Sequence, residues 1–299
     1  MLTTHTIAEL RRRIQRWRDV QQKIALVPTM GNLHKGHIEL VNRAHELADR
    51  VVVSIFVNPL QFGPDEDYPG YPRTLEADQV QLAVAGTDIL FVPDAKEMYP
   101  TGTENIAKVE IAGLSEILDG AYRPGHFIGV ATVVAKLLNI VRPDVALFGQ
   151  KDYQQLAVIR RMVRDLCMPI EIVGMATVRE ADGLALSSRN QYLSKSQRAV
   201  APLLYRTLRE LVALLRTGER DFTRLEREAV QKLTAGGMRP DYVCIRMAGS
   251  LAQPDVNTTR FVVLAAAWLG KARLIDNLEV DILTQADQTQ RLRPARAPE

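Results

Sequence analysis

The chain has 299 residues, of which 46% are hydrophobic and 24% charged, a composition typical of a folded globular protein long enough for two domains. A formal net charge of +3, from 38 basic and 35 acidic residues, gives no reason to expect nucleic acid as a partner. Cys167 and Cys244 have no metal or redox spacing, and the sequence shows neither an export signal nor an apolar run of membrane-spanning length. We therefore expect a cytoplasmic protein without membrane contact.

The first predicted element is an amphipathic helix over residues 6–20. Thr6 is a suitable N-cap, Glu9 occupies the third helical position, and apolar residues recur at helical spacing. The arginines between them could form a nucleic-acid patch, but charged helix faces usually only contact solvent, so we expect no such function.

Residues 24–58 have the pattern of a β-α-β unit. The apolar runs 24–29 and 51–57 are typical of buried parallel strands, and the segment between them places apolar residues at helical spacing. Such a unit predicts a doubly wound parallel α/β sheet, in which ligands bind at the carboxyl ends of the strands.

The turn between the first of these strands and the helix is the strongest candidate site. After Gly31 it contains His34, Lys35, Gly36 and His37. Two histidines three residues apart share one face of a helix start, where free N–H groups and the positive dipole end favour phosphate. We expect a triphosphate site here, although the chain has no P-loop or dinucleotide-binding glycine pattern. Half of a metal site or two structural histidines are the alternatives, and no cysteine–histidine cluster elsewhere completes a metal site.

Two later loops carry polar side chains. Asn58 and Gln61 follow the second strand, where their amides could bind hydroxyl and carboxylate groups or merely form a turn. Arg123 and His126 precede an apolar helix predicted over residues 127–141, and they could be site residues or ordinary surface groups.

A second strand-to-helix turn repeats the geometry of the first. Residues 145–149 predict a buried strand, and Lys151 and Asp152 stand at the start of the next helix. Cations are disfavoured at helix N-termini, so Lys151 indicates neutralisation of phosphate, whereas Asp152 could cap the helix or contact a ribose. Ser187, Ser188 and Arg189 form a polar, cationic cluster in a loop predicted over residues 179–193.

The remaining elements complete two predicted domains, a Rossmann-like domain at 1–176 and a smaller α+β domain at 177–299 that acts as a lid over the nucleotide. In the first we expect a helix at 73–85 and strands at 87–92, 106–111 and 169–177. In the second we expect helices at 195–216 and 222–234 and strands at 241–247, 260–268 and 272–278. Residues 65–72 are expected in a mobile surface loop, and the last fifteen or so in a disordered tail.

Seven motifs in this order carry a resemblance to a known family. They are PTMGNLHKGH, VNPLQFG, YPRTLEAD, YRPGHFIGVATVV, LFGQKDYQQL, READGLALSSRNQYL and LIDN, spread from about residue 24 to about residue 277. The set resembles the pantothenate synthetase (pantoate:β-alanine ligase) family of the H-x-G-H nucleotidyltransferase superfamily. The resemblance implies condensation of (R)-pantoate with β-alanine, with ATP as co-substrate, Mg²⁺ as cofactor, a pantoyl-adenylate intermediate, and a homodimer.

The resemblance also implies roles for individual residues. Catalytic roles fall to His34, His37, Lys151, Ser188 and Arg189. ATP contacts fall to Pro28, Thr29, Met30, His34, Gly36, His37, Gly149, Lys151, Asp152, Val178, Leu186, Ser187, Ser188 and Arg189. Contacts with pantoate or β-alanine fall to Met30, Asn58, Gln61, Arg123, His126 and Gln155. Asp78 matches a position near the magnesium-bound phosphates, although an exposed helical carboxylate is more often only solvated.

Two other functions compete with this interpretation. A superfamily member that transfers a nucleotidyl group to a phosphate would not need Asn58, Gln61 and Gln155. A nucleotide-sensing or RNA-binding protein with an inactive fold would have lost phosphate-binding residues, and none is missing. Leu186, where many relatives have methionine, and Gln150, where glutamate is common, are mild departures from the family pattern.

Overall fold

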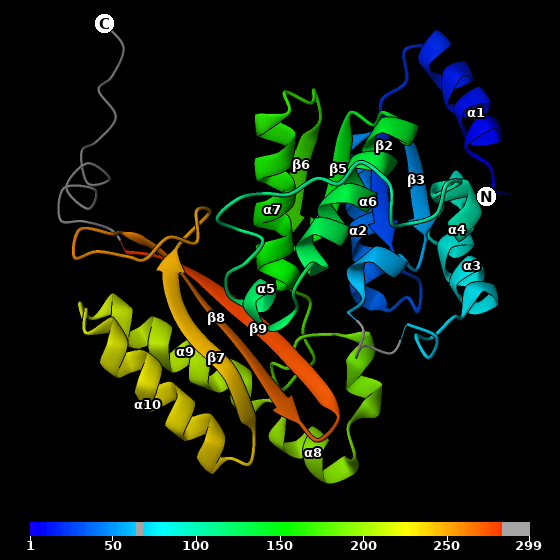
Figure 1. Ribbon diagram of the computed structural model, residues 1–299. Coiled ribbons are helices and arrows are strands. Elements are labelled where there is room, and N and C mark those ends of the chain that lie inside the picture. Colours follow the sequence, from blue (N-terminus) through cyan, green and yellow to red (C-terminus); the bar gives the residue numbers. More distant parts are fainter. Residues whose placement is uncertain (64–67, 283–299) are drawn as a thin grey trace, which may run out of the picture. The chain divides into compact units, whose positions relative to one another are not determined.

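A computed structural model describes residues 1–63 and 68–282 of the 299-residue chain (Figure 1). The chain forms two compact units, the first made of Met1–Glu180 with Ala185–Gln191, the second of Ala181–Leu184 with the residues from Tyr192 onward. Residues 65–67 of the loop expected at 65–72, and the end of the chain, lie outside the described residues. The lid function and the domain boundary after residue 176 stay predictions.

The first unit is built on a six-stranded parallel sheet, which confirms the predicted fold class. The strand order is β1-β4-β3-β2-β5-β6. The strands are β1 (Leu2–Thr4), β2 (Ile24–Thr29), β3 (Arg50–Ile55), β4 (Ile89–Phe91), β5 (Val145–Gly149) and β6 (Glu171–Met175). From β2 the chain continues to β3 and β4, whereas from β5 it continues to β6 on the other side, so the order reverses between β2 and β5. Ligands bind at such a switch point.

Helices cover both faces of this sheet. They are α1 (Ile7–Asp19), α2 (Lys35–Leu47), α3 (Leu75–Val84), α4 (Ala95–Met98), α5 (Asp119–Tyr122), α6 (His126–Val141) and α7 (Tyr153–Asp165). α2 contacts α3, whereas α6 contacts α1 and α7, consistent with one helical layer on each face. As predicted, Thr6 caps α1 by accepting a hydrogen bond from the Glu9 N–H at 3.3 Å.

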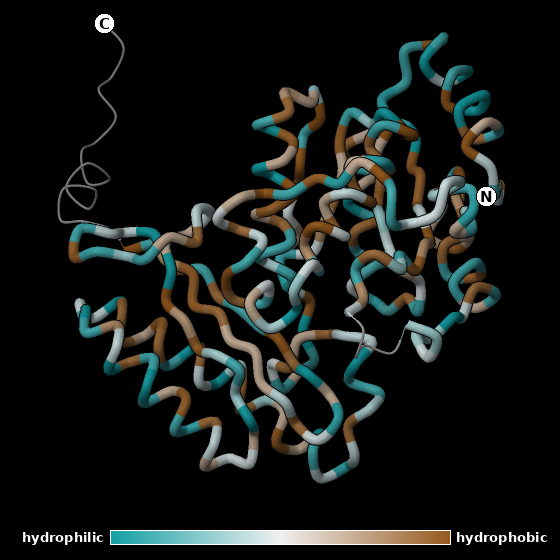
Figure 2. Tube along the Cα trace, viewed as in Figure 1, coloured by the Kyte–Doolittle hydropathy of each residue, from teal (hydrophilic) through white to brown (hydrophobic). Residues whose placement is uncertain are grey.

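The central strands are buried on both sides. In β2, Ala25 and Val27 belong to the apolar cluster around Val41 and Ala44 of α2, while Leu26 between them is also fully buried. A strand buried on both faces needs a continuous apolar run rather than alternation, which is the pattern that predicted it. Figure 2 shows the hydrophobic residues concentrated along the strands and alternating with polar ones along the helices.

The second unit is a three-stranded antiparallel sheet, β7 (Arg239–Met247), β8 (Arg260–Leu269) and β9 (Ala272–Asp281), with β8 in the centre. Two helices, α9 (Leu203–Arg216) and α10 (Phe222–Ala235), pack on it, and the short α8 (Lys195–Val200) precedes them (Figure 1). A single helix over residues 195–216 was predicted, and this was wrong. The helix is interrupted before Leu203 because Pro202 has no N–H to donate to the preceding turn.

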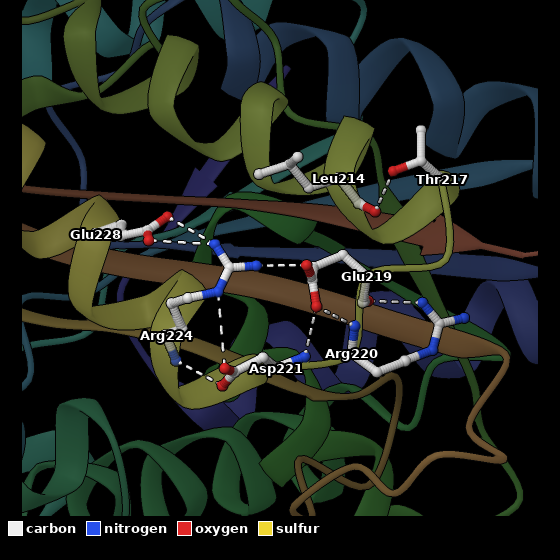
Figure 3. A network of polar contacts seen from close by, with 7 residues as sticks. All are labelled: Leu214, Thr217, Glu219, Arg220, Asp221, Arg224 and Glu228. Carbon is white, nitrogen blue, oxygen red and sulfur yellow. Dashed lines mark hydrogen bonds and ion pairs between the residues drawn. The ribbon is translucent and has the colours of Figure 1, made fainter.

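A polar network closes the turn between α9 and α10 (Figure 3). The carboxylate of Glu219 accepts hydrogen bonds from the N–H groups of Arg220 and Asp221 at 2.8 and 2.9 Å, and it pairs with Arg224. The hydrogen bonds from Asp221 and Arg220 lower the pKa of Glu219. Arg224 also pairs with Glu228 one turn later in α10 at 3.2 Å, so one guanidinium joins the turn to its helix.

The sequence predictions differ from the structure at two places where strands are concerned. β1 was not predicted, because three residues are too short for a periodic pattern. The strand expected over residues 106–111 does not form. There the Val109 and Ile111 N–H groups donate to the hydroxyls of Thr132 and Ser115, so side chains satisfy them instead of a neighbouring strand.

Within the described part of the chain, no helix has the length and apolar character required to cross a membrane.

Candidate functional site

A cavity of about 240 Å³ lies at the carboxyl ends of β2 and β5, and all of its lining residues belong to the first unit. Every residue expected to contact ATP lines it, as do Gln61 and Gln155 from the expected substrate set. Asn58, Arg123, His126 and Asp78 do not line it. The switch point of the sheet thus brings together side chains up to 161 positions apart, from Pro28 to Arg189.

The two histidines cap the helix on which they stand. His34 is the N-cap of α2, and its Nδ1 accepts a hydrogen bond from the Gly36 N–H at 3.2 Å. His37 Nδ1 accepts from the His34 N–H at 3.2 Å, which completes a reciprocal capping box, and the ring centroids lie 4.1 Å apart. A Cβ at Gly36 would lie 3.0 Å from the His34 ring, which explains why glycine stands between them.

These hydrogen bonds determine the chemical state of both rings. Because each Nδ1 accepts from a backbone N–H, each ring carries its proton on Nε2 and is neutral. The pKa of His37 is lowered from 6.5 to about 3, first by burial and next by the neighbouring His34. The pKa of His34 is also lowered, by burial and by Lys151. The pair therefore offers two neutral Nε2–H donors at neutral pH.

Asp78 fixes the turn that leads to these histidines. Its carboxylate accepts hydrogen bonds from the N–H groups of Asn32 and Leu33 at 2.9 and 2.8 Å, and from the Thr74 hydroxyl at 3.2 Å. Asp78 is 1% exposed, so the alternative of a solvated helical carboxylate was wrong. The turn needs this anchor because Gly31 and Asn32 both have left-handed backbone angles, with φ of 79° and 51°. The observed contacts favour a structural role, and metal binding by Asp78 stays a prediction.

Lys151 and Asp152 come from the short 3₁₀ helix η2 (Gln150–Asp152), which follows β5 directly. Lys151 Nζ lies 3.9 Å from the Asp152 carboxylate, and its side chain is 15% exposed. Asp152 makes no side-chain cap with α7, so the cap alternative does not explain its position. A cation at the end of β5 thus stands beside the same cavity as the donors at the end of β2.

The loop with Ser187, Ser188 and Arg189 returns to this cavity after a short excursion into the second unit. The Leu186 N–H donates to the Val178 carbonyl at 2.9 Å, which joins the segments on either side of this excursion. Ser187 Oγ accepts from the Arg189 N–H at 3.2 Å at the start of the 3₁₀ helix η3 (Ser188–Tyr192). Local hydrogen bonds therefore hold the serines and arginine at the cavity wall.

Gln61 brings an amide to the cavity from the 3₁₀ helix η1 (Pro59–Gln61) after β3. Asn58 is 1% exposed and contacts Gln61 rather than the cavity, with its Nδ2 3.3 Å from Gln61 Oε1. His126 Nδ1 donates to the Gln61 carbonyl at 2.7 Å, and Arg123 Nη1 donates to His126 Nε2 at 2.9 Å. Arg123, His126 and Asn58 thus lie behind Gln61.

An apolar wall was missed by the sequence interpretation. Val130, Val133, Val134 and Leu137 line the cavity along one face of α6, with Phe148 and Met175 from the sheet. Their i, i+3, i+4, i+7 spacing was visible, but α6 is apolar on nearly every side, so periodicity alone could not indicate which face meets a ligand.

Whether the site could hold the expected Mg²⁺ depends on the carboxylates near the cavity. The described residues contain no group of three or more histidine, cysteine, aspartate or glutamate side chains arranged to hold a metal. Asp152 and Glu39 do line the cavity. Mg²⁺ in nucleotide sites is commonly bound through phosphates and only one or two carboxylates, so these residues fit a metal that arrives with a triphosphate.

Comparison with known proteins shows similarity to one enzyme family over almost the whole chain. The family model for pantoate-beta-alanine ligase matches residues 2–279. Pantothenate synthetase from Azotobacter vinelandii is 58% identical over 282 residues, which cover 94% of this chain and 100% of that protein. Pantothenate synthetase from Pseudomonas aeruginosa is 57% identical with the same coverage.

Solved structures agree with these sequence matches. Pantothenate synthetase from Thermus thermophilus has a TM-score of 0.87 at 48% identity, covering 94% of this chain and 100% of that one. The pantoate-beta-alanine ligase of Francisella tularensis, described as complexed with beta-gamma ATP and beta-alanine, has a TM-score of 0.76 at 37% identity, covering 93% and 97% of the two chains. The chain therefore belongs to the pantoate–β-alanine ligase family, and it is a ligase.

Proposed function

We propose that this ligase condenses pantoate with β-alanine to pantothenate, through pantoyl adenylate, with release of AMP and pyrophosphate. One observation carries the proposal: the two Nε2–H donors and Lys151 line the same cavity as the amides of Gln61 and Gln155. Phosphate-binding groups and groups suited to a polyhydroxy acid thus share one site. The ATP and β-alanine named for the Francisella tularensis ligase support the same pair of substrates here.

The first half-reaction is attack of the pantoate carboxylate on the α-phosphorus of ATP, with pyrophosphate as the leaving group. The carboxylate is already ionised at neutral pH, so no general base is required. Negative charge develops on the phosphate oxygens, and His34, His37 and Lys151 supply preorganised donors to them. Ser188 and Arg189 supply further donors to the departing pyrophosphate.

The pantoate subsite combines amides with an apolar wall. Gln61 and Gln155 can donate to its carboxylate and hydroxyl oxygens, while Met30 and the α6 face around Val134 can contact its two methyl groups. The ammonium group of β-alanine first loses a proton to solvent, and the free amine then attacks the activated carbonyl carbon. The C–N bond forms, the bond from that carbon to the phosphate oxygen breaks, AMP leaves, and the nitrogen releases a second proton. An acyl adenylate hydrolyses readily, so closure of the second unit over the nucleotide would protect it.

Three finer features belong to the same proposal. Mg²⁺ would bind the triphosphate beside Asp152 and Glu39 and supply charge neutralisation when bound. The active protein is a homodimer, as expected from the family resemblance, and it is cytoplasmic, as expected from its cysteine usage and lack of an export signal. Sedimentation equilibrium would give about twice the 33.4 kDa chain mass if the dimer forms, and the chain mass if it does not.

The test is to incubate the protein with ATP, Mg²⁺ and pantoate, with and without β-alanine, and to measure pyrophosphate, AMP and pantothenate. We expect pyrophosphate release to require pantoate, and AMP with pantothenate to appear only when β-alanine is added. Folded protein that releases no pyrophosphate with pantoate would contradict the proposed substrate. Other carboxylic and phosphate acceptors would then be assayed in its place.

A further inference from the structure

A line of hydrogen bonds leads from the protein interior to the cavity. The Tyr99 hydroxyl donates to Asn58 Oδ1 at 2.8 Å, Asn58 Nδ2 donates to Gln61 Oε1 at 3.3 Å, and Gln61 Nε2 donates to Met30 Sδ. Tyr99 is 3% exposed and does not line the cavity, whereas Gln61 and Met30 do. The hydrogen bonds of Tyr99 therefore reach the cavity through Asn58.

The orientation of the Asn58 amide follows from its backbone partners. Its Oδ1 accepts from the Leu60 N–H at 3.3 Å, and its Nδ2 donates to the Gly129 carbonyl at 3.1 Å. A flipped amide would place two donors against each other and two acceptors against each other. Since Oδ1 must accept, the Tyr99 hydroxyl must donate. Burial raises the pKa of Tyr99, which keeps that proton in place.

Tyr99 itself is held firmly by its neighbours. It follows α4, whose Glu97 carboxylate accepts from the Ile7 N–H at 2.7 Å. Its ring lies 6.1 Å from the Phe56 ring and 5.4 Å from Lys136 Nζ. Because β4 and β3 are adjacent parallel strands, the segments that follow them meet at one edge of the sheet, and this brings Tyr99 to Asn58.

We propose that Tyr99 is a positioning residue for the pantoate subsite, acting through Asn58 on the Gln61 amide. With Oε1 held by Asn58, Gln61 presents its amino group to the cavity. That donor suits the carboxylate and hydroxyl oxygens of pantoate, whereas a rotated Gln61 would present an acceptor and repel the carboxylate. The inference rests on the proposed function, because it assigns these oxygens to pantoate.

The substitution Tyr99→Phe removes the hydroxyl and leaves the ring packing intact. We expect the KM for pantoate to rise about three- to tenfold, on the scale of one buried hydrogen bond, with the KM for ATP unchanged. The matched control is Tyr242→Phe in β7 of the second unit, which should change neither constant. Thermal melts of all three proteins establish that each variant is folded.

A double-mutant cycle separates positioning from general support of the fold. In a Gln61→Ala background, Tyr99→Phe should have no further effect on the KM for pantoate, because the side chain through which it acts is gone. The inference is overturned if folded Tyr99→Phe binds pantoate normally, or if its full effect persists without the Gln61 side chain. If the wild type makes no pantothenate, the proposed function fails first, so the two failures are distinguishable.

Discussion

At the scale of single residues, His34 and His37 combine two tasks that substitution can separate. Each Nδ1 caps α2, and each Nε2–H is available to the cavity. Asparagine is a good N-cap and glutamine a good third helical residue, so His34→Asn and His37→Gln should preserve the cap while removing the imidazole donor. We expect each variant to keep its melting temperature and to lose about 10²- to 10³-fold in the rate of pantoate-dependent pyrophosphate release. Either variant with near-normal turnover would exclude that histidine from catalysis.

The lowered pKa of His37 makes a separate prediction about stability. The folded protein keeps His37 neutral down to about pH 3, whereas an unfolded chain protonates it near 6.5. Between these values the unfolded state binds more protons, so the free energy of unfolding falls as the pH falls below 6.5. Urea unfolding at pH 7 and pH 5 should show the wild type losing about 1 to 2 kcal/mol more than His37→Gln. Equal losses would mean that the folded state tolerates a charged His37.

At the scale of elements, the position of Gln61 depends on how closely η1 approaches α6. A Cβ at Gly129 would lie 2.2 Å from the Leu60 carbonyl oxygen and 2.7 Å from the Gln61 nitrogen, and both are backbone atoms. Gly129→Ala must therefore push η1 away from α6. We expect a loss of about 1 to 3 kcal/mol in the free energy of unfolding and a raised KM for pantoate. The KM for ATP is the internal control, and normal pantoate binding with normal stability would contradict this dependence.

The same elements show how far sequence could predict this site. The bounds of β2 and β5 and the histidine and lysine turns after them were predicted, because long buried runs and helix starts have local patterns. The placement of Asp78, Asn58 and His126 behind the cavity could not be predicted, since it depends on contacts between segments 45 to 71 positions apart. The motifs indicated which residues gather at the site. Only the packing of α6 against η1 determines which of these residues line the cavity and which support the lining residues.

At the scale of the whole molecule, the proposal that the second unit acts as a lid predicts how amide exchange changes in both units when ligands bind. Each unit has its own apolar core, that of the first around β2 and β3 and that of the second around β8 and α9, so their amide exchange can be followed separately. With a non-hydrolysable ATP analogue, Mg²⁺ and pantoate, we expect slower exchange in residues 31–37 and 149–152, where we propose that the nucleotide binds. A lid predicts slower exchange in peptides of the second unit as well, because closure shields its own amides from water. Pantoate alone is the control, and unchanged exchange in the second unit with all ligands present would contradict the proposed lid.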